Sequence, residues 1–173
     1  MLNIARRVSY HVTGWLHSTL VTGVFCYGAD GTVVWGKFNC PGSWNDGEVS
    51  RGFQEKLMDP TKTAPGMGVV ADSAFPVRDG MFGRIITPMK EGDLERASPE
   101  CRVGLVAMSN AITSIRQAAE WGMGSTSKCF RRLLMPLPYD PVVRGRRMEN
   151  IYRLYNLRVR KTGISQIRSV FFP

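Results

Sequence analysis

Two acidic residues stand at positions where a protein can collect catalytic groups. Asp72 directly follows the apolar run at residues 68–71, which has the profile of a buried strand, and open α/β sheets gather functional groups at the carboxyl ends of such strands. Glu120 lies beside the apolar stripe of a predicted helix, so its carboxylate flanks a core. Carboxylate oxygens suit Mg²⁺, and two such ions about 4 Å apart can stabilise phosphodiester cleavage. A pair brought together in space is the kind of site that this chemistry needs, but by itself it is weak evidence, since most Asp and Glu residues simply solvate a surface.

Each carboxylate also has a purely structural interpretation. Asp72 could cap the turn that precedes Pro76, and Glu120 could be a solvated helix residue paired with Arg116 at i−4. A third carboxylate, Asp46, could join a metal site, but its simpler role is to cap the helix that follows it.

The elements that must position these residues can be read from the sequence pattern. Residues 19–38 predict a β-hairpin, because two β-branched and aromatic runs meet at an Asp-Gly turn, Asp30 and Gly31. A helix is expected after residue 46, with apolar residues at spacing four. Residues 83–87 predict a second short strand, and the charged segment 90–97 predicts a loop.

Two longer helices are expected in the second half of the chain. The first begins with Ser98 as N-cap and Pro99 at its first position. The second is a basic amphipathic helix over residues 144–161, and a short apolar tail at 164–172 follows it. The first helix presents one apolar stripe to a core: Leu105, Met108, Ile112, Ile115 and Ala119.

The chain has 173 residues and a net charge of +9, and the excess charge is concentrated at one end. Residues 131–173 hold 10 basic and 2 acidic side chains, whereas residues 1–130 hold 13 and 12. Such a region could bind a phosphate backbone in a salt-dependent manner, or it could be a solvated face that keeps the protein soluble. We prefer DNA contact, with these residues as candidates: Arg131, Arg132, Arg144, Arg146, Arg147, Arg158, Arg160 and Lys161.

Other classes of protein do not fit the pattern. The apolar stretch at residues 20–27 is too short for a membrane span, and no signal-peptide pattern follows Arg6 and Arg7, so we expect an intracellular soluble protein. The four cysteines lack the spacing of a zinc site or a disulfide scaffold. We interpret all four as small hydrophobic residues.

Four stretches that include these carboxylates occur in a definite order: Pro-Gly-Ser-Trp-Asn-Asp at 41–46, Val-Ala-Asp-Ser-Ala-Phe-Pro at 70–76, Arg-Gln-Ala-Ala-Glu-Trp-Gly-Met at 116–123, and 154–160 with 163–168. Together they resemble the transposase-derived DDE superfamily endonucleases of the PIF/Harbinger type, over about residues 10–173. The resemblance implies an α/β, RNase H-like mixed sheet flanked by helices, forming a single domain over residues 1–173.

The resemblance also assigns roles to individual residues. Asp72 matches the second catalytic aspartate of the family, and Glu120 matches its terminal glutamate, both as ligands of Mg²⁺ or Mn²⁺. The first aspartate of the family lies upstream of the stretch that begins here at Tyr10, and none of the nine residues before Tyr10 is acidic. We therefore expect the N-terminal strand with the first aspartate to be missing, with Asp46 as the best substitute by position.

The functional expectation is a metal-dependent DNA endonuclease or transposase catalytic domain. Loss of the first aspartate could leave this domain inactive. The alternative is a catalytically dead DNA-binding or protein-interaction module that uses the basic C-terminal region. The resemblance further implies a nuclear location and a separate DNA-binding partner protein.

Overall fold

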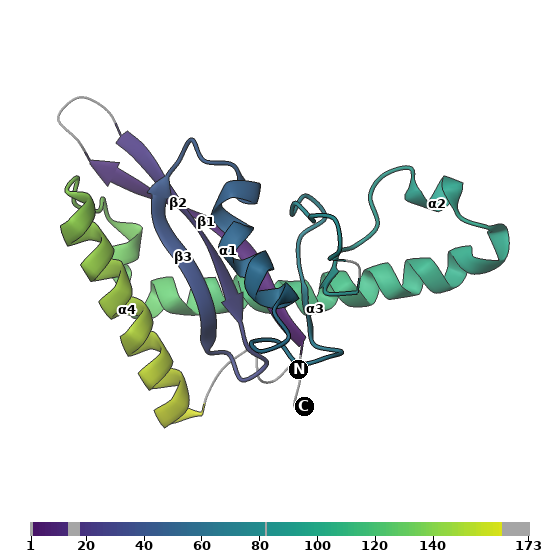
Figure 1. The fold of residues 1–173 in the computed structure, drawn as a ribbon. Helices are drawn as coiled ribbons and strands as arrows, with labels where there is room; N and C mark the ends of the chain where they lie inside the picture. The colour runs from purple at the N-terminus through teal and green to yellow at the C-terminus, as the bar shows by residue number, and fades with distance from the viewer. Residues whose placement is uncertain (1, 14–17, 82, 164–173) are drawn as a thin grey trace.

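A mixed five-stranded sheet forms the centre of the molecule (Figure 1). The computed structural model describes residues 2–13, 18–81 and 83–163. The strands are β1 (Leu2–Thr13), β2 (Ser18–Tyr27), β3 (Val33–Pro41), β4 (Gly68–Val70) and β5 (Ile85–Ile86), in the spatial order β3-β2-β1-β4-β5. The first three strands pair antiparallel, β4 pairs with β1 in parallel, and β5 pairs with β4 in parallel.

The described N-terminal residues form a strand, β1, and the expectation that the family's aspartate-bearing strand is missing stays a prediction. β1 occupies the centre of the sheet, between β2 and β4, and its parallel register with β4 pairs Ile4 with Val70. Its β-branched and aromatic residues favour this extended, paired conformation. Its twelve residues include no Asp or Glu, so the strand supplies no carboxylate.

Helices cover both faces of the sheet, as the resemblance predicts. Tyr27 and Phe25 of β2 belong to a core formed with the two long helices, whereas Val24 and Cys26 belong to a second core on the opposite face. This alternation is the period of two that an extended strand imposes. The helices are α1 (Asp46–Met58), α2 (Asp93–Arg96), α3 (Arg102–Cys129) and α4 (Pro141–Thr162), with 3₁₀ turns at Pro99–Cys101 and Arg131–Leu134.

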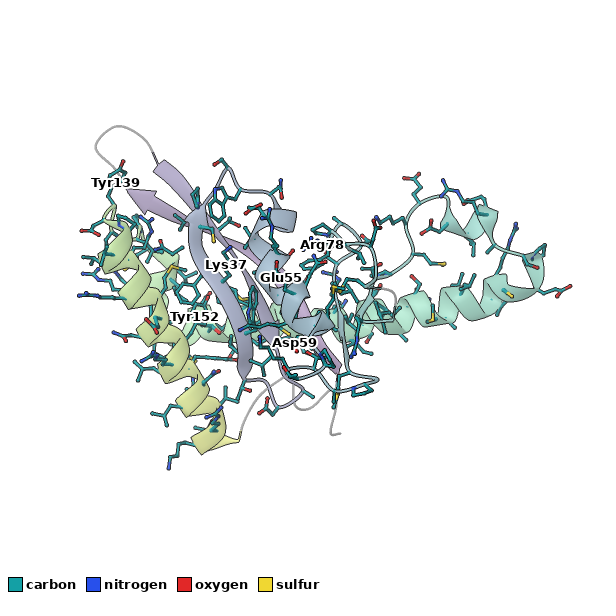
Figure 2. All side chains as sticks on the ribbon, viewed as in Figure 1. Lys37, Glu55, Asp59, Arg78, Tyr139 and Tyr152 are labelled. Atoms are coloured by element: carbon teal, nitrogen blue, oxygen red, sulfur yellow. The ribbon has the colours of Figure 1, made fainter. Side chains whose placement is uncertain are left out.

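Helix α4 packs along β3 through aromatic and amide contacts. Tyr152 points from α4 toward the sheet, where its ring centroid lies 4.3 Å from that of Phe25 (Figure 2). The side-chain amide of Asn156 accepts a hydrogen bond from the Val33 N–H at 2.8 Å and donates one to the Val33 carbonyl at 2.8 Å. Asn156 thus pairs with this end of β3 as a neighbouring strand would.

The turns follow the local sequence signals. The Asp30 carboxylate accepts hydrogen bonds from the backbone N–H and hydroxyl of Thr32, and Gly31 adopts a φ of 86°. The predicted hairpin turn is therefore confirmed. Residues 90–97 were expected to be a loop, but they contain the single-turn helix α2. Asp93 and Arg96 form an ion pair at a spacing of three residues, which a helical turn brings together.

The start of α3 also differs from the prediction. Ser98 precedes a 3₁₀ turn and its side chain caps nothing, and α3 itself begins at Arg102. The predicted apolar stripe is wrong in its first half, because Met108 is exposed while Ile112 and Ala119 are buried. The first turns of α3 extend past the edge of the sheet, and only the helix from Ile112 onward reaches the body of the protein (Figure 1).

Candidate active site

Asp72 lies just beyond the carboxyl end of β4, as the sequence predicts. Its Oδ1 accepts a hydrogen bond from the Ala74 N–H at 2.9 Å, which is the turn-capping role. Its Oδ2 faces Nη1 of Arg116 at 3.4 Å. The side chain is 47% exposed, so Asp72 is only partly covered while one oxygen holds the turn and the other faces Arg116.

Glu120 and Arg116 lie one turn apart on the part of α3 that packs against the sheet. Nη1 of Arg116 donates to Oε1 of Glu120 at 3.1 Å, and the Arg116 side chain is only 23% exposed. Ala118 and Ala119 between them are fully buried, which allows α3 to approach the sheet closely and fixes where these polar side chains emerge. The predicted pairing of Glu120 with Arg116 is therefore confirmed, and its role as a metal ligand stays a prediction.

The fold brings the two predicted carboxylates to one point. Asp72 and Glu120 contact the same nitrogen of Arg116, so their oxygens lie no farther apart than the sum of the two contact distances. The contact of Arg116 with Asp72 was not predicted, because the two residues lie 44 positions apart in the chain and no local pattern links them.

Asp46 is not the cap of the helix that it begins. The N-cap of α1 is Asn45, whose side chain accepts from the Glu48 N–H at 2.9 Å, and Asp46 is the first residue of the helix. The capping role predicted for Asp46 is thereby corrected, since an Asn cap satisfies the helix N-terminus as well as an Asp cap does. Its role as a metal ligand stays a prediction. Over the described ranges, no three His, Cys, Asp or Glu side chains gather in a way that could hold a metal ion.

The strand beside Asp72 offers no further ligand. The parallel pairing of β1 with β4 runs from Leu2–Gly68 to Ile4–Val70 and ends two residues before Asp72. β1 contains no Asp or Glu, so it adds no carboxylate to this site.

The donor set fits one divalent ion better than two. Two partly exposed carboxylates supply hard oxygen ligands, and Mg²⁺ commonly binds through one or two carboxylates while retaining several waters. When bound there, such an ion would polarise a phosphoryl oxygen and lower the pKa of a bound water. Asp72 and Glu120 would hold it, and Arg116 would keep their orientation.

The basic residues near the C-terminus are mostly exposed on η2 (Arg131–Leu134) and on the outer face of α4. Arg146 and Arg160 lie fourteen residues apart in α4 and share a face with Arg153, which the sequence analysis did not single out and which pairs with Glu149 at 2.5 Å. Arg158 contacts the Cys129 sulfur at the end of α3. The exposed members of the predicted set are Arg131, Arg132, Arg146, Arg147, Arg158, Arg160 and Lys161.

Arg144 differs from the rest of this set because it is buried. Its guanidinium donates to the Asn39 side chain and to the carbonyls of Pro138 and Tyr139, at 3.1 and 2.7 Å. Burial lowers the pKa of Arg144 from its usual value, and nearby Asp140 opposes that shift. These contacts tie the start of α4 to β3, so we assign Arg144 a structural role and remove it from the DNA-contact set.

The cysteines are all free. Cys26 and Cys40 are buried in the core as predicted, and burial raises the pKa of the Cys40 thiol. Cys101 is exposed in the turn before α3, so the prediction of a small hydrophobic role is wrong for this residue.

The fold and the site together define a class: an α/β protein whose acidic side chains meet where a parallel strand ends. The family model described as DDE superfamily endonuclease matches residues 6–156, and the chain therefore belongs to this family. No curated protein and no solved structure gives a match to this chain. Over the part of the chain that the structure describes, no helix has the length and apolar character needed to cross a bilayer.

Proposed function

We propose that this chain is a divalent-metal-dependent endonuclease domain of the PIF/Harbinger type that cleaves DNA phosphodiester bonds. Asp72 and Glu120 would be its catalytic metal ligands. The observation that carries this proposal is the shared contact of both carboxylates with Nη1 of Arg116, at 3.4 and 3.1 Å. A loop after β4 and a helix far along the chain deliver these carboxylates to one place, as a metal-assisted phosphoryl transfer requires.

The exposed basic residues of η2 and α4 supply a surface for the DNA backbone. Seven exposed Arg and Lys side chains could each neutralise a phosphate, which gives affinity with little dependence on sequence. By the resemblance, the protein would act in the nucleus, with a separate DNA-binding protein supplying the choice of target.

The test is a plasmid-nicking assay in Mg²⁺ or Mn²⁺, with Asp72→Asn and Glu120→Gln beside the wild type. The proposal expects metal-dependent conversion of supercoiled plasmid to nicked circles, and a loss of about a hundredfold or more in each variant. Glu149→Gln, a carboxylate on α4 paired with Arg153, is the matched control and should nick normally. Nicking that persists in both site variants would refute the assignment.

A second function is supported by a different observation. No acidic residue lies in β1, so the third carboxylate of the family pattern is not supplied by this strand. A domain in this state would bind DNA through its basic surface without cutting it. Salt-dependent DNA binding by wild type, Asp72→Asn and Glu120→Gln alike, with no nicking by any of them, would identify this second function.

A further inference from the structure

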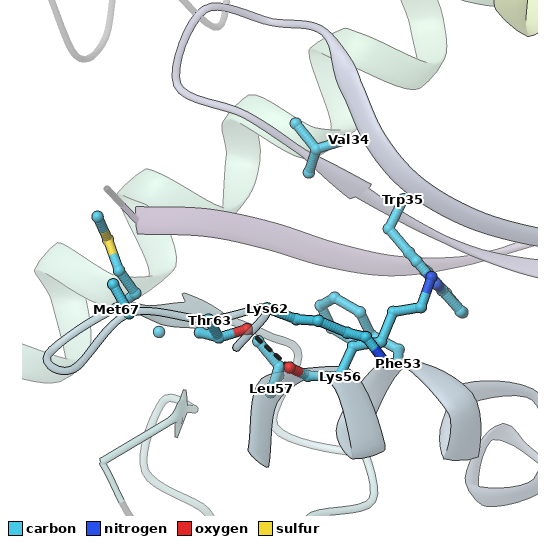
Figure 3. Close-up of a pocket in the computed structure, with 10 residues that line it drawn as sticks. Val34, Trp35, Phe53, Lys56, Leu57, Lys62, Thr63 and Met67 are labelled. Atoms are coloured by element: carbon cyan, nitrogen blue, oxygen red, sulfur yellow. Dashed lines mark hydrogen bonds between the residues drawn. The ribbon is translucent and has the colours of Figure 1, made fainter. Parts of the chain in front are cut away.

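A cavity of about 440 Å³ lies on the α1 side of the sheet, away from the site described above. It is open to one side and lined by β3, the second half of α1 and the segment that leads into β4 (Figure 3). Gly68 at the amino end of β4 lines it, whereas Asp72 follows the carboxyl end of that strand. Its volume falls in the range of small-molecule sites.

One wall of the cavity is aromatic. Trp35 of β3 and Phe53 of α1 lie with their ring centroids 4.8 Å apart and their planes inclined by 33°. Phe53 is buried, while the half-buried Trp35 keeps part of its ring accessible to the cavity. Leu57 and Met67 extend this apolar surface. Such a wall favours a flat ring, because stacking on an indole face is tolerant of the identity of the ring.

Two lysines supply the charge of the lining. Lys56 and Lys62 are the charged residues that line the cavity, and Figure 3 shows both side chains converging on it beside Phe53. Nζ of Lys62 lies 3.0 Å from Oδ2 of Asp59, so part of its charge is compensated. Lys56 forms no ion pair with any carboxylate of the described residues. The lining therefore leaves a net positive charge next to an aromatic wall.

We propose that this cavity binds a nucleotide unit, with its base against Trp35 and its phosphate held by Lys56 and Lys62. The base would pack against the aromatic wall. The ammonium groups would bind the phosphate, with which lysine interacts as a point charge. Two sources share this chemistry: a free nucleoside monophosphate, and the 5′-terminal nucleotide of a DNA single strand. The inference does not depend on the nuclease site.

The test is calorimetric titration of the full chain with four probes: AMP, adenosine, inorganic phosphate and a 5′-phosphorylated DNA trinucleotide. AMP or the trinucleotide should bind about tenfold more tightly than adenosine or phosphate alone, because base and phosphate are both engaged. The tighter of the two phosphorylated probes identifies the source of the nucleotide.

Variants locate the binding. The double substitution Lys56→Gln/Lys62→Gln should weaken the binding of the nucleotide by about tenfold or more. The matched double substitution Lys90→Gln/Lys128→Gln, on exposed lysines that do not line the cavity, should leave it unchanged. Asp72→Asn should bind like the wild type, which separates this inference from the nuclease proposal. Absence of binding by both phosphorylated probes, equal weakening in the two double variants, or equal affinity for phosphate alone would overturn it.

Discussion

Asp72 and Glu120 contact the same nitrogen of Arg116, although one follows a strand and the other lies in a long helix. The guanidinium balances one of the two negative charges, so a divalent cation that bound there would meet two carboxylates and one opposing positive charge. Arg116 therefore holds the carboxylates in place and also limits their attraction for a metal ion.

This relationship predicts that Arg116→Gln binds Mn²⁺ more tightly than the wild type. Removing a positive charge within hydrogen-bond distance of both carboxylates should strengthen cation binding by about fivefold at low salt. Calorimetric titration with MnCl₂ measures this, and Asp72→Asn in the same titration should bind more weakly than the wild type. An affinity that is unchanged or lower in Arg116→Gln would contradict this electrostatic role.

The paired hydrogen bonds between Asn156 and Val33 predict a loss of stability on truncation. Asn156→Ala leaves the N–H and carbonyl of Val33 without their partners and should lower the free energy of unfolding by about 1–2 kcal/mol. Urea unfolding followed by circular dichroism measures the change. Asn150→Ala, at an exposed position of the same helix, is the control and should change stability by less than about 0.5 kcal/mol.

Substitution of Arg144 should lower stability, whereas substitution of its exposed neighbours should weaken DNA binding. Arg144→Met should lower the free energy of unfolding by about 2 kcal/mol, because the Asn39 side chain and two carbonyls lose a charged donor. Arg146→Gln/Arg147→Gln should leave stability nearly unchanged. In DNA-binding titrations over a range of salt, that double variant should reduce the slope of log K against log salt by about 2. A wild-type slope in the double variant would show that α4 is not part of the DNA-binding surface.

Asp59 provides a pH-dependent test of the turn after α1. Hydrogen bonds from the Thr61 hydroxyl, from Lys62 and from the Thr61 N–H lower the pKa of Asp59 from 3.8 to about 2. Because the native pKa is depressed, this stabilisation is fully present above about pH 4 and is lost as the pH falls through about 2.

NMR titration of the Asp59 carboxyl group measures this pKa directly. In Thr61→Val the largest contribution is removed, and the Asp59 pKa should rise toward 3.8. A midpoint that does not move in this variant would show that the Thr61 hydroxyl is not the cause.

Local signals in the sequence were sufficient for much of the fold. The Asp30–Gly31 turn, the strand before Asp72 and the helix that carries Glu120 follow from residue type and short-range periodicity. Their meeting at Arg116 depends on the register of β4 and on the depth at which α3 crosses the sheet, which a single sequence does not encode locally.

The errors have the same physical origin. Met108 fits an apolar period, but the helix projects past the sheet there, so periodicity alone cannot tell a core face from an unpacked one. Arg144 lies among arginines that are exposed, and its contacts with β3 and with the loop before α4 bury it. Asn45 and Asp46 are adjacent residues with similar capping preferences, so the choice between them is settled by the backbone geometry of the loop.

The most direct test of the nuclease site is a change of metal preference on ligand substitution. Asp72→Cys and Glu120→Cys replace a hard oxygen ligand with a softer sulfur, which Mg²⁺ accepts poorly and Mn²⁺ tolerates better. We predict plasmid nicking by the wild type in both ions, and nicking by each variant that is lost in Mg²⁺ and partly restored in Mn²⁺. A wild type that nicks in neither ion, or variants that nick equally well in both, would contradict the assignment of Asp72 and Glu120 as metal ligands.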